Sequence, residues 1–560
     1  MRRKKILINK ENTKKISEAL KGNIIIASLI DQAGIKYTDL EEYINPKMEN
    51  LNSPFLFKDM EKAVKRIIES VDKKENILIY GDYDADGNTA TAILIHFFRK
   101  IGHKNISYMI PSRLIDGYGI SMDKISEIKE KNIDLIITVD CGIKNVDEIK
   151  KLNELGIDVI LTDHHEQGDE IPDAFSVINP KVKKEKYPFK ELSGAGVSFK
   201  LVSGINEKLN ILSKKDIYIL MLIASIGTIG DVMPLIKENR DIINICRKNL
   251  KINDLPNGLK ELFIDYPNFN AEDIAYYIVP KINSSGRMGE EFAIKLLVEE
   301  DIFYAKKYKE KLEFLNEERK RLTEEGFLEI DKKIIEEKIY NNDYIFVGKE
   351  NLHEGVIGII ASKVSEKYNK AVSIYTNKNN GEMVASSRCI NQDVNIYNFL
   401  EKFKKYFTAF GGHDFAAGFS FKKEDEEKIK DLISKEKVLK EEKILKYNNV
   451  LNLNEISLDL VKSMEILKPF GNKNEEPIFL FKNLFVKNIV RYPKITKITF
   501  TQKVGHKINL KTKEKIYVEK EIDAISFKNL DDINIGEEID IYANLRINSF
   551  RGIENVQLFI

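Results

Sequence analysis

Short apolar runs alternate with amphipathic segments between residues 76 and 165. Four of these runs are rich in Ile, Leu and Val, as buried strands are, and they span 76–80, 105–110, 133–139 and 157–162. The segments between them place apolar residues at helical spacing. This alternation predicts an α/β fold with a doubly wound parallel sheet, whose ligand crevice lies at the carboxyl ends of the strands.

The pattern changes along the rest of the chain, and each change marks a predicted domain boundary. Residues 1–50 are mixed helix and loop, and residues 51–300 hold the first α/β domain. The heavily charged segment 301–342 has helical apolar spacing and predicts a long connecting helix. Residues 343–447 predict a second α/β domain, and the short alternating strands within 448–560 predict a small β-barrel of the OB type.

Three carboxylates, Asp82, Asp84 and Asp86, lie on the turn between the first strand and the helix that follows it. Like charges so close together repel, and they need a cation or a helix N-terminus to stay ionised. An EF-hand loop would need Glu at its twelfth position, which counted from Asp82 is Ile93, and a P-loop would need a Lys that is missing. We therefore interpret the turn as a divalent-metal site, with a solvated acidic turn as the alternative.

Two later strands end in residues of the same chemistry. Asp140 follows the third strand, and Asp163, His164 and His165 follow the fourth. A lone Asp at a strand end is usually a helix cap, but several at one rim of a parallel sheet predict a shared site. Carboxylate and imidazole ligands together suit Mn²⁺, with Mg²⁺ as the alternative. Because adjacent side chains diverge, we expect one of the two His on the metal and the other on the substrate.

Other segments carry further candidates. Asp231 follows the glycine pair Gly227 and Gly230 at the end of a long apolar stretch, where a carboxylate is costly unless it is paired or binds a metal. Arg287, in a predicted polar loop, is either a phosphate ligand or a surface residue. Residues 353–361 predict a glycine-containing loop that leads into a helix, and the N-terminus of such a helix is a natural anion site.

A glycine cluster occupies residues 411–418 and surrounds His413. Small residues such as Gly412 allow the backbone to approach a substrate strand closely. The interpretation of His413 stays open between a structural hydrogen-bonding residue and a substrate contact.

Composition narrows the class of protein. With 560 residues, 43% of them hydrophobic and 32% charged, the chain predicts several globular domains rather than a disordered protein. The apolar runs predict no membrane span, and the start of the chain predicts no secretory signal. Three scattered cysteines without a C-x-x-C pair, Cys141, Cys246 and Cys389, fit a reducing cytoplasm and argue against a zinc ribbon.

A formal net charge of +1 excludes a globally basic nucleic-acid binder but leaves room for a local basic groove. Residues 482–513 contain nine Lys or Arg and no Asp or Glu, interleaved with Phe485, Tyr492 and Phe500. Cations for the backbone and aromatic rings for base stacking predict binding of single-stranded nucleic acid. The alternative is a basic β surface without a ligand.

Several motifs together resemble the DHH phosphoesterase superfamily, and within it the single-strand-specific DNA exonucleases. They are Gly-Asp-Tyr-Asp-Ala-Asp-Gly, Val-Asp-Cys-Gly, Thr-Asp-His-His, Gly-Asp-Val-Met-Pro-Leu and Gly-Gly-His-Asp-Phe-Ala-Ala-Gly. The likeness covers nearly the whole chain. It implies a DHH catalytic domain, a connecting helix, a substrate-binding DHHA1 domain and a nucleic-acid-binding OB domain, arranged as a ring around single-stranded DNA.

The resemblance also implies roles for individual residues. Two Mn²⁺ or Mg²⁺ ions would be held by Asp82, Asp84, Asp86, Asp140, His164 and Asp231. His165 would contact the scissile phosphate and form the catalytic set with Asp140 and Asp86. The 5′-terminal phosphate and the adjoining DNA would be held by Arg113, Arg287, Ser386, Arg388, Gly412 and His413. One departure is that the family's usual Ser-Gly-Arg-Ser reads Ser-Ser-Arg-Cys here, so Ser387 and Cys389 replace a Gly and a Ser.

The activity implied by the resemblance is 5′→3′ exonucleolytic release of 5′ mononucleotides from single-stranded DNA by two-metal hydrolysis, in DNA repair and recombination. The implied partners are single-stranded DNA, a single-strand-binding protein and a helicase, with no membrane, and a ring closed by one chain predicts a monomer. One alternative is a nanoRNase or cyclic-dinucleotide phosphodiesterase, which generally lacks an OB domain. Another is a replication-fork scaffold, which predicts eroded metal ligands, whereas this chain keeps every expected carboxylate and both His.

Overall fold

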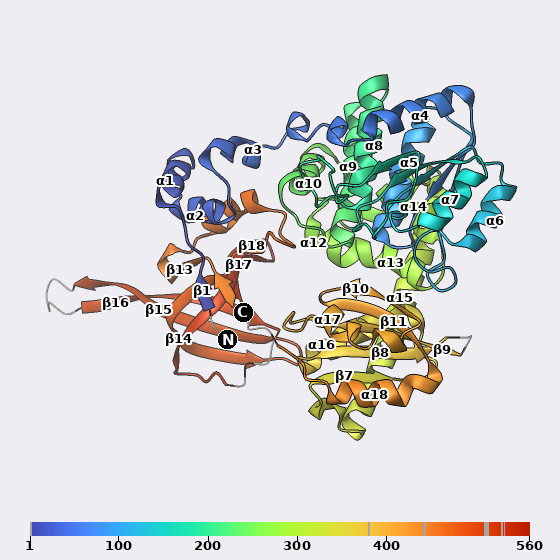
Figure 1. Ribbon diagram of the computed structural model, residues 1–560. Coiled ribbons are helices and arrows are strands. Elements are labelled where there is room, and N and C mark those ends of the chain that lie inside the picture. The colour runs from blue at the N-terminus through green and yellow to red at the C-terminus, as the bar shows by residue number, and fades with distance from the viewer. Residues whose placement is uncertain (1–2, 379–380, 441–443, 509–514, 528–529, 531) are drawn as a thin grey trace. The chain divides into compact units, whose positions relative to one another are not determined.

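The computed structural model describes residues 3–378, 381–440, 444–508, 515–527, 530 and 532–560, and the chain divides into two compact units (Figure 1). The larger unit comprises Leu51–Met233 and Lys237–Glu442. The smaller unit comprises Met1–Asn50, Pro234–Ile236 and Lys443–Ile560. None of the described helices is long and apolar enough to cross a membrane.

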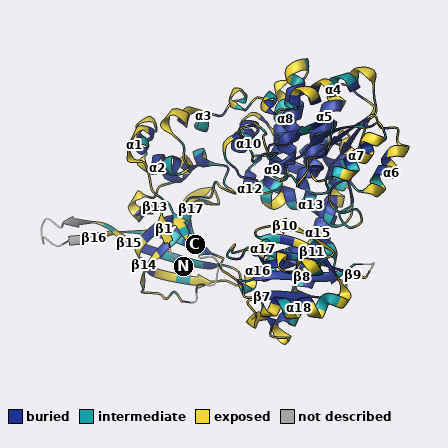
Figure 2. Ribbon diagram, in the orientation of Figure 1, coloured by how far each residue is buried: buried dark blue, intermediate teal, exposed yellow. Residues whose placement is uncertain are grey.

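The larger unit begins with a parallel sheet of strand order β3-β2-β4-β5-β6. Strands β2 and β4 are buried along their whole length, as expected when helices cover both faces (Figure 2). The predicted doubly wound parallel sheet is confirmed. The elements are α4 (Met60–Lys73), β2 (Ile77–Tyr80), α5 (Ala85–Lys100), β3 (Ile106–Met109), α6 (Met122–Glu130), β4 (Leu135–Thr138), α7 (Val146–Glu154), β5 (Asp158–Thr162) and β6 (Ser176–Ile178).

Helices after the sheet complete this α/β domain and lead into the connecting helix. They are α8 (Gly194–Leu209), α9 (Lys214–Gly230), α10 (Lys237–Asn249), α11 (Asn257–Phe263), α12 (Ala271–Asp273), the π-helix η5 (Ile274–Ile278), α13 (Val279–Arg287), α14 (Phe292–Leu297) and α15 (Ile302–Glu336). The prediction of a polar loop around Arg287 is wrong, because α13 begins with Pro280 in its first turn and ends at Arg287. The predicted connecting helix is present as α15, with 35 residues.

A second sheet, of order β10-β11-β9-β8-β7, forms the remainder of the larger unit. Only β7 and β8 run parallel, and the other neighbours pair antiparallel. Its elements are β7 (Tyr344–Gly348), α16 (Ile357–Tyr368), β8 (Ala371–Asn377), β9 (Glu382–Arg388), α17 (Ile396–Glu401), β10 (Ala409–His413), β11 (Ala416–Lys422) and α18 (Glu426–Lys435). The expected loop over residues 353–361 ends where α16 begins.

The smaller unit contains the predicted β-barrel. Strand β14 pairs with both β15 and β17, while β16 joins β18 through only two residue pairs, so the barrel is partly closed. Its strands are β13 (Asn449–Leu451), β14 (Phe479–Arg491), β15 (Thr496–Ile508), β16 (Lys515–Ser526), β17 (Glu538–Phe550) and β18 (Ile553–Phe559), with the helix α19 (Leu458–Ser463) between the first two. An OB-type barrel is therefore confirmed.

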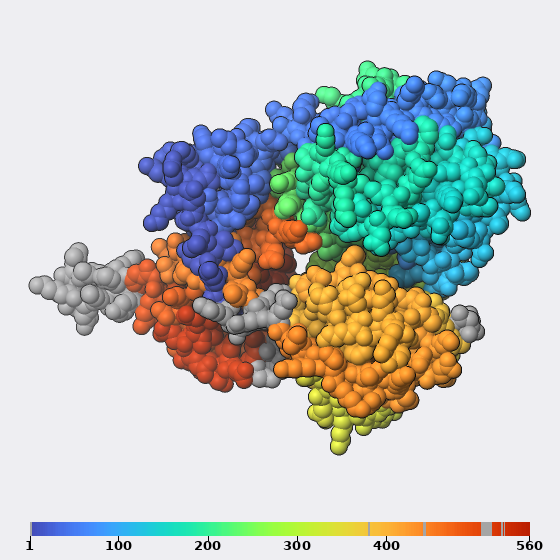
Figure 3. Space-filling model, viewed as in Figure 1, coloured from blue at the N-terminus to red at the C-terminus, as the bar shows by residue number. Residues whose placement is uncertain are grey.

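The first fifty residues belong to this smaller unit. Strand β1 (Arg3–Lys5) pairs in parallel with β12 (Leu445–Tyr447), and helices α1 (Lys10–Ala19) and α2 (Ile24–Gln32) place Ile16 and Ile26 in one core with barrel residues such as Phe479. Figure 3 shows these N-terminal residues against the orange residues of the C-terminal part. The sequence held no local signal of this long-range pairing.

Candidate metal centre

The acidic turn is held between the N-termini of two helices. Asp84 is the N-cap of α5, and its Oδ1 accepts hydrogen bonds from the backbone N–H groups of Asp86 (2.9 Å) and Gly87 (3.1 Å). The Asp86 carboxylate accepts hydrogen bonds from the N–H groups of Gly194 (2.6 Å) and Ala195 (2.9 Å), at the start of α8. The backbone N–H groups at both helix N-termini therefore offset part of the repulsion between these carboxylates.

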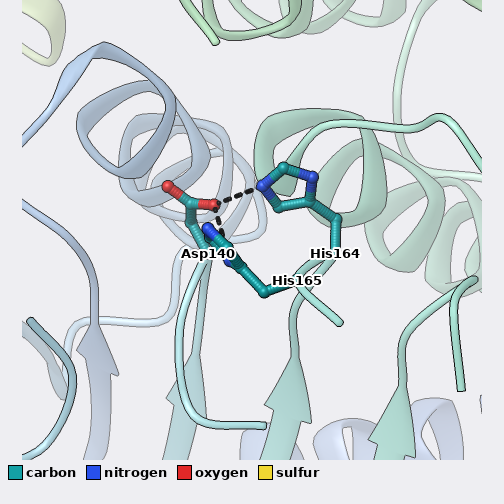
Figure 4. Close-up of side chains that lie close together, drawn as sticks. All are labelled: Asp140, His164 and His165. Atoms are coloured by element: carbon teal, nitrogen blue, oxygen red, sulfur yellow. Dashed lines mark ion pairs between the residues drawn. The ribbon is translucent and has the colours of Figure 1, made fainter. Parts of the chain in front are cut away.

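Asp140 adopts an unusual backbone conformation after β4. Its φ is +61°, in the left-handed region that non-glycine residues rarely occupy and that tends to mark functional sites. This conformation directs the Asp140 carboxylate toward the His pair that follows β5 (Figure 4). Oδ1 of Asp140 lies 3.1 Å from Nε2 of His164 and 4.0 Å from Nδ1 of His165.

Nε2 of His164 faces carboxylates from three separate elements. Besides Asp140, it lies 3.7 Å from Oδ2 of Asp86 on α5 and 3.6 Å from Oδ2 of Asp231, the residue that ends α9. A side chain on Gly227 would collide with this group, because its Cβ would lie 2.3 Å from Oδ1 of Asp86. The glycine therefore lets α9 approach α5 closely enough to bring Asp231 to the site.

Three sets of side chains are close enough to share a cation, since one donor atom from each member lies within 4.8 Å of the others. The sets are Asp82 with Asp84 and Asp140, Asp86 with His164 and Asp231, and Asp140 with His164 and His165. The first two sets have no residue in common, so the centre offers room for two ions. The structure thus brings together all six predicted metal ligands, together with His165.

Several buried polar atoms of this group have no hydrogen-bond partner among the described residues. They are Oδ1 of Asp82, Oδ1 of Asp140, and both ring nitrogens of His164. An unpaired polar group in the interior costs about 1–3 kcal/mol. Carboxylate and imidazole donors suit Mn²⁺ and are compatible with Mg²⁺, so the residues present fit a divalent cation at this point.

Burial and mutual repulsion shift the pKa values of the residues in this centre. Burial, followed by the charge of a neighbouring aspartate, raises the pKa of Asp82, Asp140 and Asp231 well above the usual range and that of Asp86 to about 6. Burial lowers the pKa of His164 to about 3. Protons therefore compete with a cation for the carboxylates, whereas the imidazole is already deprotonated and ready to coordinate.

We expect Mn²⁺ to raise the Tm of the metal-stripped protein more at about pH 7.5 than at about pH 5. The pKa of Asp86 is about 6 in the folded protein and about 4 in the unfolded chain. Its protonation therefore stabilises the metal-free fold at pH values below about 4, and this contribution is lost as the pH rises through about 6. A cation replaces those protons at high pH, and at a hundredfold excess over Kd it adds about 2.7 kcal/mol. Differential scanning fluorimetry measures the gain, and an equal gain at both pH values would contradict the expectation.

Asp163 orients the second histidine instead of joining a metal set. Its carboxylate accepts hydrogen bonds from the N–H groups of Ile143 (3.0 Å) and His164 (2.7 Å) and lies 2.8 Å from Nδ1 of His165. The Tyr118 hydroxyl lies 2.9 Å from the same Nδ1 and donates to the carbonyl oxygen of Asp140 at 3.1 Å. The sequence placed Asp163 at the rim of the sheet but gave no signal for Tyr118, which lies in an irregular loop after β3.

A group of arginines lies around the segment that leads into α16. The residues expected at the 5′-terminal phosphate come together here: Arg388 donates to Oγ of Ser386 (3.1 Å), Arg287 donates to the carbonyl oxygen of Gly355 (3.0 Å), and the Arg113 guanidinium lies over the ring of Tyr83 (5.4 Å). A Cβ on Gly358, in the first turn of α16, would lie 3.1 Å from Nη2 of Arg388. The helix N-terminus expected to bind an anion therefore faces this group.

Repulsion within the group shows in the pKa values. Burial and then the charges of Arg113, Arg388 and Arg319 lower the pKa of Arg287 to about 9, and burial and Arg113 lower that of Arg388 to about 10. Arg319 on α15 is a member that sequence reasoning missed, because its segment reads as a solvated charged helix. We call Arg113, Arg287, Arg319 and Arg388 the arginine cluster.

Ser387, which replaces the family's usual glycine, does not point into this cluster. Neighbouring residues of a strand face opposite sides of the sheet, so Ser387 lies on the face opposite Ser386 and Arg388. Its side chain is fully buried, and its Oγ lies 2.7 Å from Oγ of Ser373, which in turn lies 2.7 Å from the Tyr344 hydroxyl. The extra hydroxyl is therefore accommodated without narrowing the arginine cluster.

Gly412 and His413 lie on β10, the exposed edge strand of the second sheet. Burial and then the positive charges of His165, Lys144 and Lys181 lower the pKa of His413. His413 thus lies within electrostatic reach of the metal centre, but it belongs to none of the three ligand sets found among the described residues.

The basic stretch of the smaller unit differs in part from the prediction. Phe485 and Tyr492 are 44% and 59% exposed, but Phe500 is fully buried in the barrel core and cannot stack on a base, so that prediction is wrong. Lys487 and Lys497 form ion pairs with acidic residues of β16, which offset part of the positive charge. Residues 509–514 of the stretch lie outside the described residues.

Comparison with known proteins matches family models to three parts of the chain. The DHH family N-terminal domain matches residues 76–225, the DHHA1 domain residues 341–438 and the RecJ OB domain residues 447–560. The single-stranded-DNA-specific exonuclease RecJ of Bacillus subtilis is 32% identical over 575 residues, covering 99% of this chain and 69% of that protein. The Escherichia coli exonuclease of the same name is 31% identical over 394 residues, covering 66% of this chain and 67% of that one.

Solved structures show the same architecture. The crystal structure of RecJ in complex with Mn²⁺ from Thermus thermophilus matches with a TM-score of 0.82 at 24% identity, covering 100% of this chain and 78% of that one. A crystal structure of exonuclease RecJ bound to manganese matches with a TM-score of 0.59 at 30% identity, covering 68% of this chain and 95% of that one.

Proposed function

Because the chain belongs to the RecJ family of single-stranded-DNA-specific exonucleases, we propose that its metal centre hydrolyses the terminal phosphodiester bond of single-stranded DNA and releases 5′ mononucleotides from the 5′ end. The enzyme is a metal-dependent nuclease in DNA repair and recombination. The observation that carries the proposal is the convergence of seven carboxylate and imidazole side chains on three overlapping cation sets, in the same unit as the arginine cluster.

Mn²⁺ or Mg²⁺ is the cofactor, as in the RecJ structures solved with those ions. Two ions would be held by Asp82, Asp84, Asp86, Asp140, His164 and Asp231. When bound, the ions supply Lewis-acid chemistry that activates water and offsets the charge on the departing oxygen. Backbone N–H groups at the two helix N-termini hold Asp84 and Asp86 in place. Gly227 leaves room for the Asp86 carboxylate beside α9.

His165 holds a proton beside the reacting phosphate. Burial opposes its protonation, but the hydrogen bond to Asp163 and the charge of that carboxylate raise the pKa of His165 overall. Burial alone would raise the pKa of Asp163. The contact with His165 outweighs burial, lowers this pKa to about 2 and so keeps Asp163 ionised. With Nδ1 occupied by Asp163, Nε2 of His165 is left to contact the scissile phosphate.

The polarity of digestion follows from where the 5′ end is held. Arg113, Arg287, Ser386 and Arg388, with the N-terminus of α16, offer cations and donors to a terminal phosphate. A phosphate fixed there would place the first phosphodiester bond at the metal centre, so each cut would release one nucleotide. The exposed β10, with Gly412 and His413, would lie along the strand.

The smaller unit would add further contacts to the single strand. Its exposed Phe485 and Tyr492 and the lysines of β14 and β15 fit base stacking and backbone contacts. A helicase that unwinds DNA and a single-strand-binding protein that coats the product would supply the substrate to one copy of the chain. The free cysteines fit our proposal of the cytoplasm as the compartment.

We expect Mn²⁺-dependent release of mononucleotides from single-stranded DNA that carries a label on its 5′ phosphate. The label should appear first as a mononucleotide, and the same strand in a blunt duplex should resist digestion. Products resolved on a denaturing gel check the result. Release from the 3′ end, or digestion confined to dinucleotides, would refute the proposal and favour a small-oligonucleotide phosphodiesterase.

A further inference from the structure

The irregular loop between β3 and α6 brings a tyrosine hydroxyl to the catalytic histidine. This loop spans residues 110–121, and Tyr118 lies near its end. The Tyr118 hydroxyl lies 2.9 Å from Nδ1 of His165 and donates a hydrogen bond to the carbonyl oxygen of Asp140 at 3.1 Å. One oxygen atom therefore joins the residue expected to contact the scissile phosphate to the main chain of a metal ligand.

The contact with Asp140 decides how the Tyr118 hydroxyl meets His165. A hydroxyl has a single hydrogen, and a carbonyl oxygen can only accept it, so the Tyr118 oxygen faces Nδ1 of His165 as an acceptor. Oδ1 of Asp163 lies 2.8 Å from the same nitrogen and is a second acceptor. Both contacts require Nδ1 to carry a hydrogen, which leaves Nε2 as the nitrogen that faces the substrate.

The main chain beside Tyr118 is held in place by two other elements. The hydroxyl of Tyr80, the last residue of β2, donates to the carbonyl oxygen of Gly119 at 3.1 Å. The Asn145 side chain accepts from the N–H group of Ile120 (3.2 Å) and donates to its carbonyl oxygen (2.9 Å). Gly119 has a φ of +84°, and a Cβ there would lie 2.7 Å from Oδ1 of Asn145, so this close approach requires glycine. Tyr118 thus stands on a fastened segment of the loop.

The ring of Tyr118 contributes little to the core. The residue is 45% exposed, and its ring meets that of His165 edge to face with centroids 5.3 Å apart. An aromatic residue that served packing alone would bury its ring, because buried area is what large rings contribute to a core. The hydroxyl contacts therefore account for a tyrosine at this position better than packing does.

We propose that Tyr118 is a positioning residue, whose hydroxyl is anchored on the Asp140 carbonyl oxygen and holds the ring of His165 toward the reacting phosphate. This inference rests on the proposed function and deepens it. A displacement of about 1 Å in a reacting group can lower a rate roughly 100-fold. Because Tyr118 acts on the placement of His165, its loss lowers kcat and leaves the binding of the strand nearly unchanged.

The first test is Tyr118→Phe, which removes the hydroxyl and keeps the ring. At saturating Mn²⁺, we expect kcat on a 5′-phosphorylated single strand to fall about 10-fold, as for the loss of one hydrogen bond, with KM nearly unchanged. Tyr276→Phe is the matched control, because Tyr276 is a 75% exposed tyrosine of η5 in the same unit, and it should change neither value. An unchanged kcat in Tyr118→Phe, or an effect confined to KM, would overturn the inference.

The second test asks whether Tyr118 acts through His165. In a His165→Ala background, followed by single-turnover kinetics with excess enzyme, Tyr118→Phe should lower the remaining rate by less than about twofold, because the ring that the hydroxyl holds is gone. A loss of equal size in both backgrounds would show that the hydroxyl supports the fold or the metal ligands instead, and would contradict the proposed role.

A third measurement does not depend on activity. In metal-free protein labelled with ¹⁵N in its histidine rings, Tyr118→Phe should shift the ring-nitrogen resonances of His165, which are identified by their disappearance in His165→Ala. His96 is the internal reference, since its Nε2 contacts the carbonyl oxygen of Leu297. Resonances of His165 that stay in place would show that the hydroxyl does not hold its ring.

Failure of the inference and failure of the proposed function give different results. An unsubstituted enzyme that digests no single strand would refute the proposed function, and the ¹⁵N resonances would still report on the contact between Tyr118 and His165. An active enzyme whose kcat is the same in Tyr118→Phe would refute only the role of Tyr118.

Discussion

Asp140→Ala abolishes Mn²⁺-dependent digestion of single-stranded DNA, with a loss of roughly 10³-fold or more in kcat/KM, or about 4 kcal/mol of transition-state stabilisation. Asp140 belongs to two of the three cation sets, and its Oδ1 lies 3.1 Å from Nε2 of His164. Its removal therefore takes a ligand from one ion position and the carboxylate beside His164 from the edge of the other. A gel assay with end-labelled substrate at saturating Mn²⁺ measures the loss.

The fold should survive this change. The Asp140 carboxyl is buried among other acids, so its removal relieves repulsion, although Ala tolerates the φ of +61° less well than Asp. Asp140→Asn keeps the shape and the backbone preference, and should lose activity to a similar extent with an unchanged metal-free Tm. Asp147→Ala, an exposed carboxylate in the first turn of α7, is the matched control and should keep full activity. Activity of Asp140→Asn near that of the control would remove Asp140 from the metal centre.

Asp163→Asn lowers kcat by about 10³-fold while the affinity for Mn²⁺ stays nearly unchanged. Asp163 fixes the ring of His165 through a 2.8 Å contact to Nδ1 and is absent from every cation set. In a serine protease, replacing the carboxylate that fixes the tautomer of the catalytic His lowers kcat by up to about 10⁴-fold, although the geometry of the site is kept. Steady-state kinetics and calorimetric titration with Mn²⁺ separate the two effects.

The pH dependence of stability gives this variant an independent check. The pKa of Asp163 is lowered to about 2 in the folded protein, so its contribution to stability is present above the unfolded pKa of about 4 and is lost as the pH falls toward 2. Asp163→Asn should therefore be less stable than the unsubstituted protein near neutral pH, and the difference should shrink in acid. A large loss of Mn²⁺ affinity would instead make Asp163 a metal ligand.

Much of the metal centre was predictable because it depends on a simple regularity. The carboxyl ends of parallel strands meet at one edge of a sheet, so residues 82–86, Asp140 and the pair His164 and His165 had to converge once the strands were recognised. The hydrophobic runs that mark those strands are strong local signals. Asp231 was found for another reason, since a carboxylate at the end of a buried helix needs a partner.

Features that depend on distant contacts could not be predicted in this way. The left-handed backbone of Asp140 and the hydroxyl of Tyr118 beside His165 leave no pattern in the sequence. Arg319 lies among many charged residues of α15, and only the packing of that helix separates it from its solvated neighbours. Phe500 was wrongly predicted to stack on a base, because the sequence does not show which face of its strand points into the barrel core.

The parallel pairing of β1 with β12 has a consequence for how the protein is made. The partner strand of residues 3–5, residues 445–447, is synthesised more than four hundred residues after them. At about 5–20 residues per second, the early strand and the helices α1 and α2 wait tens of seconds for the barrel that covers them. The larger unit can be complete before then, so the nascent chain carries a finished nuclease core while β1 still exposes an unpaired strand edge to chaperones.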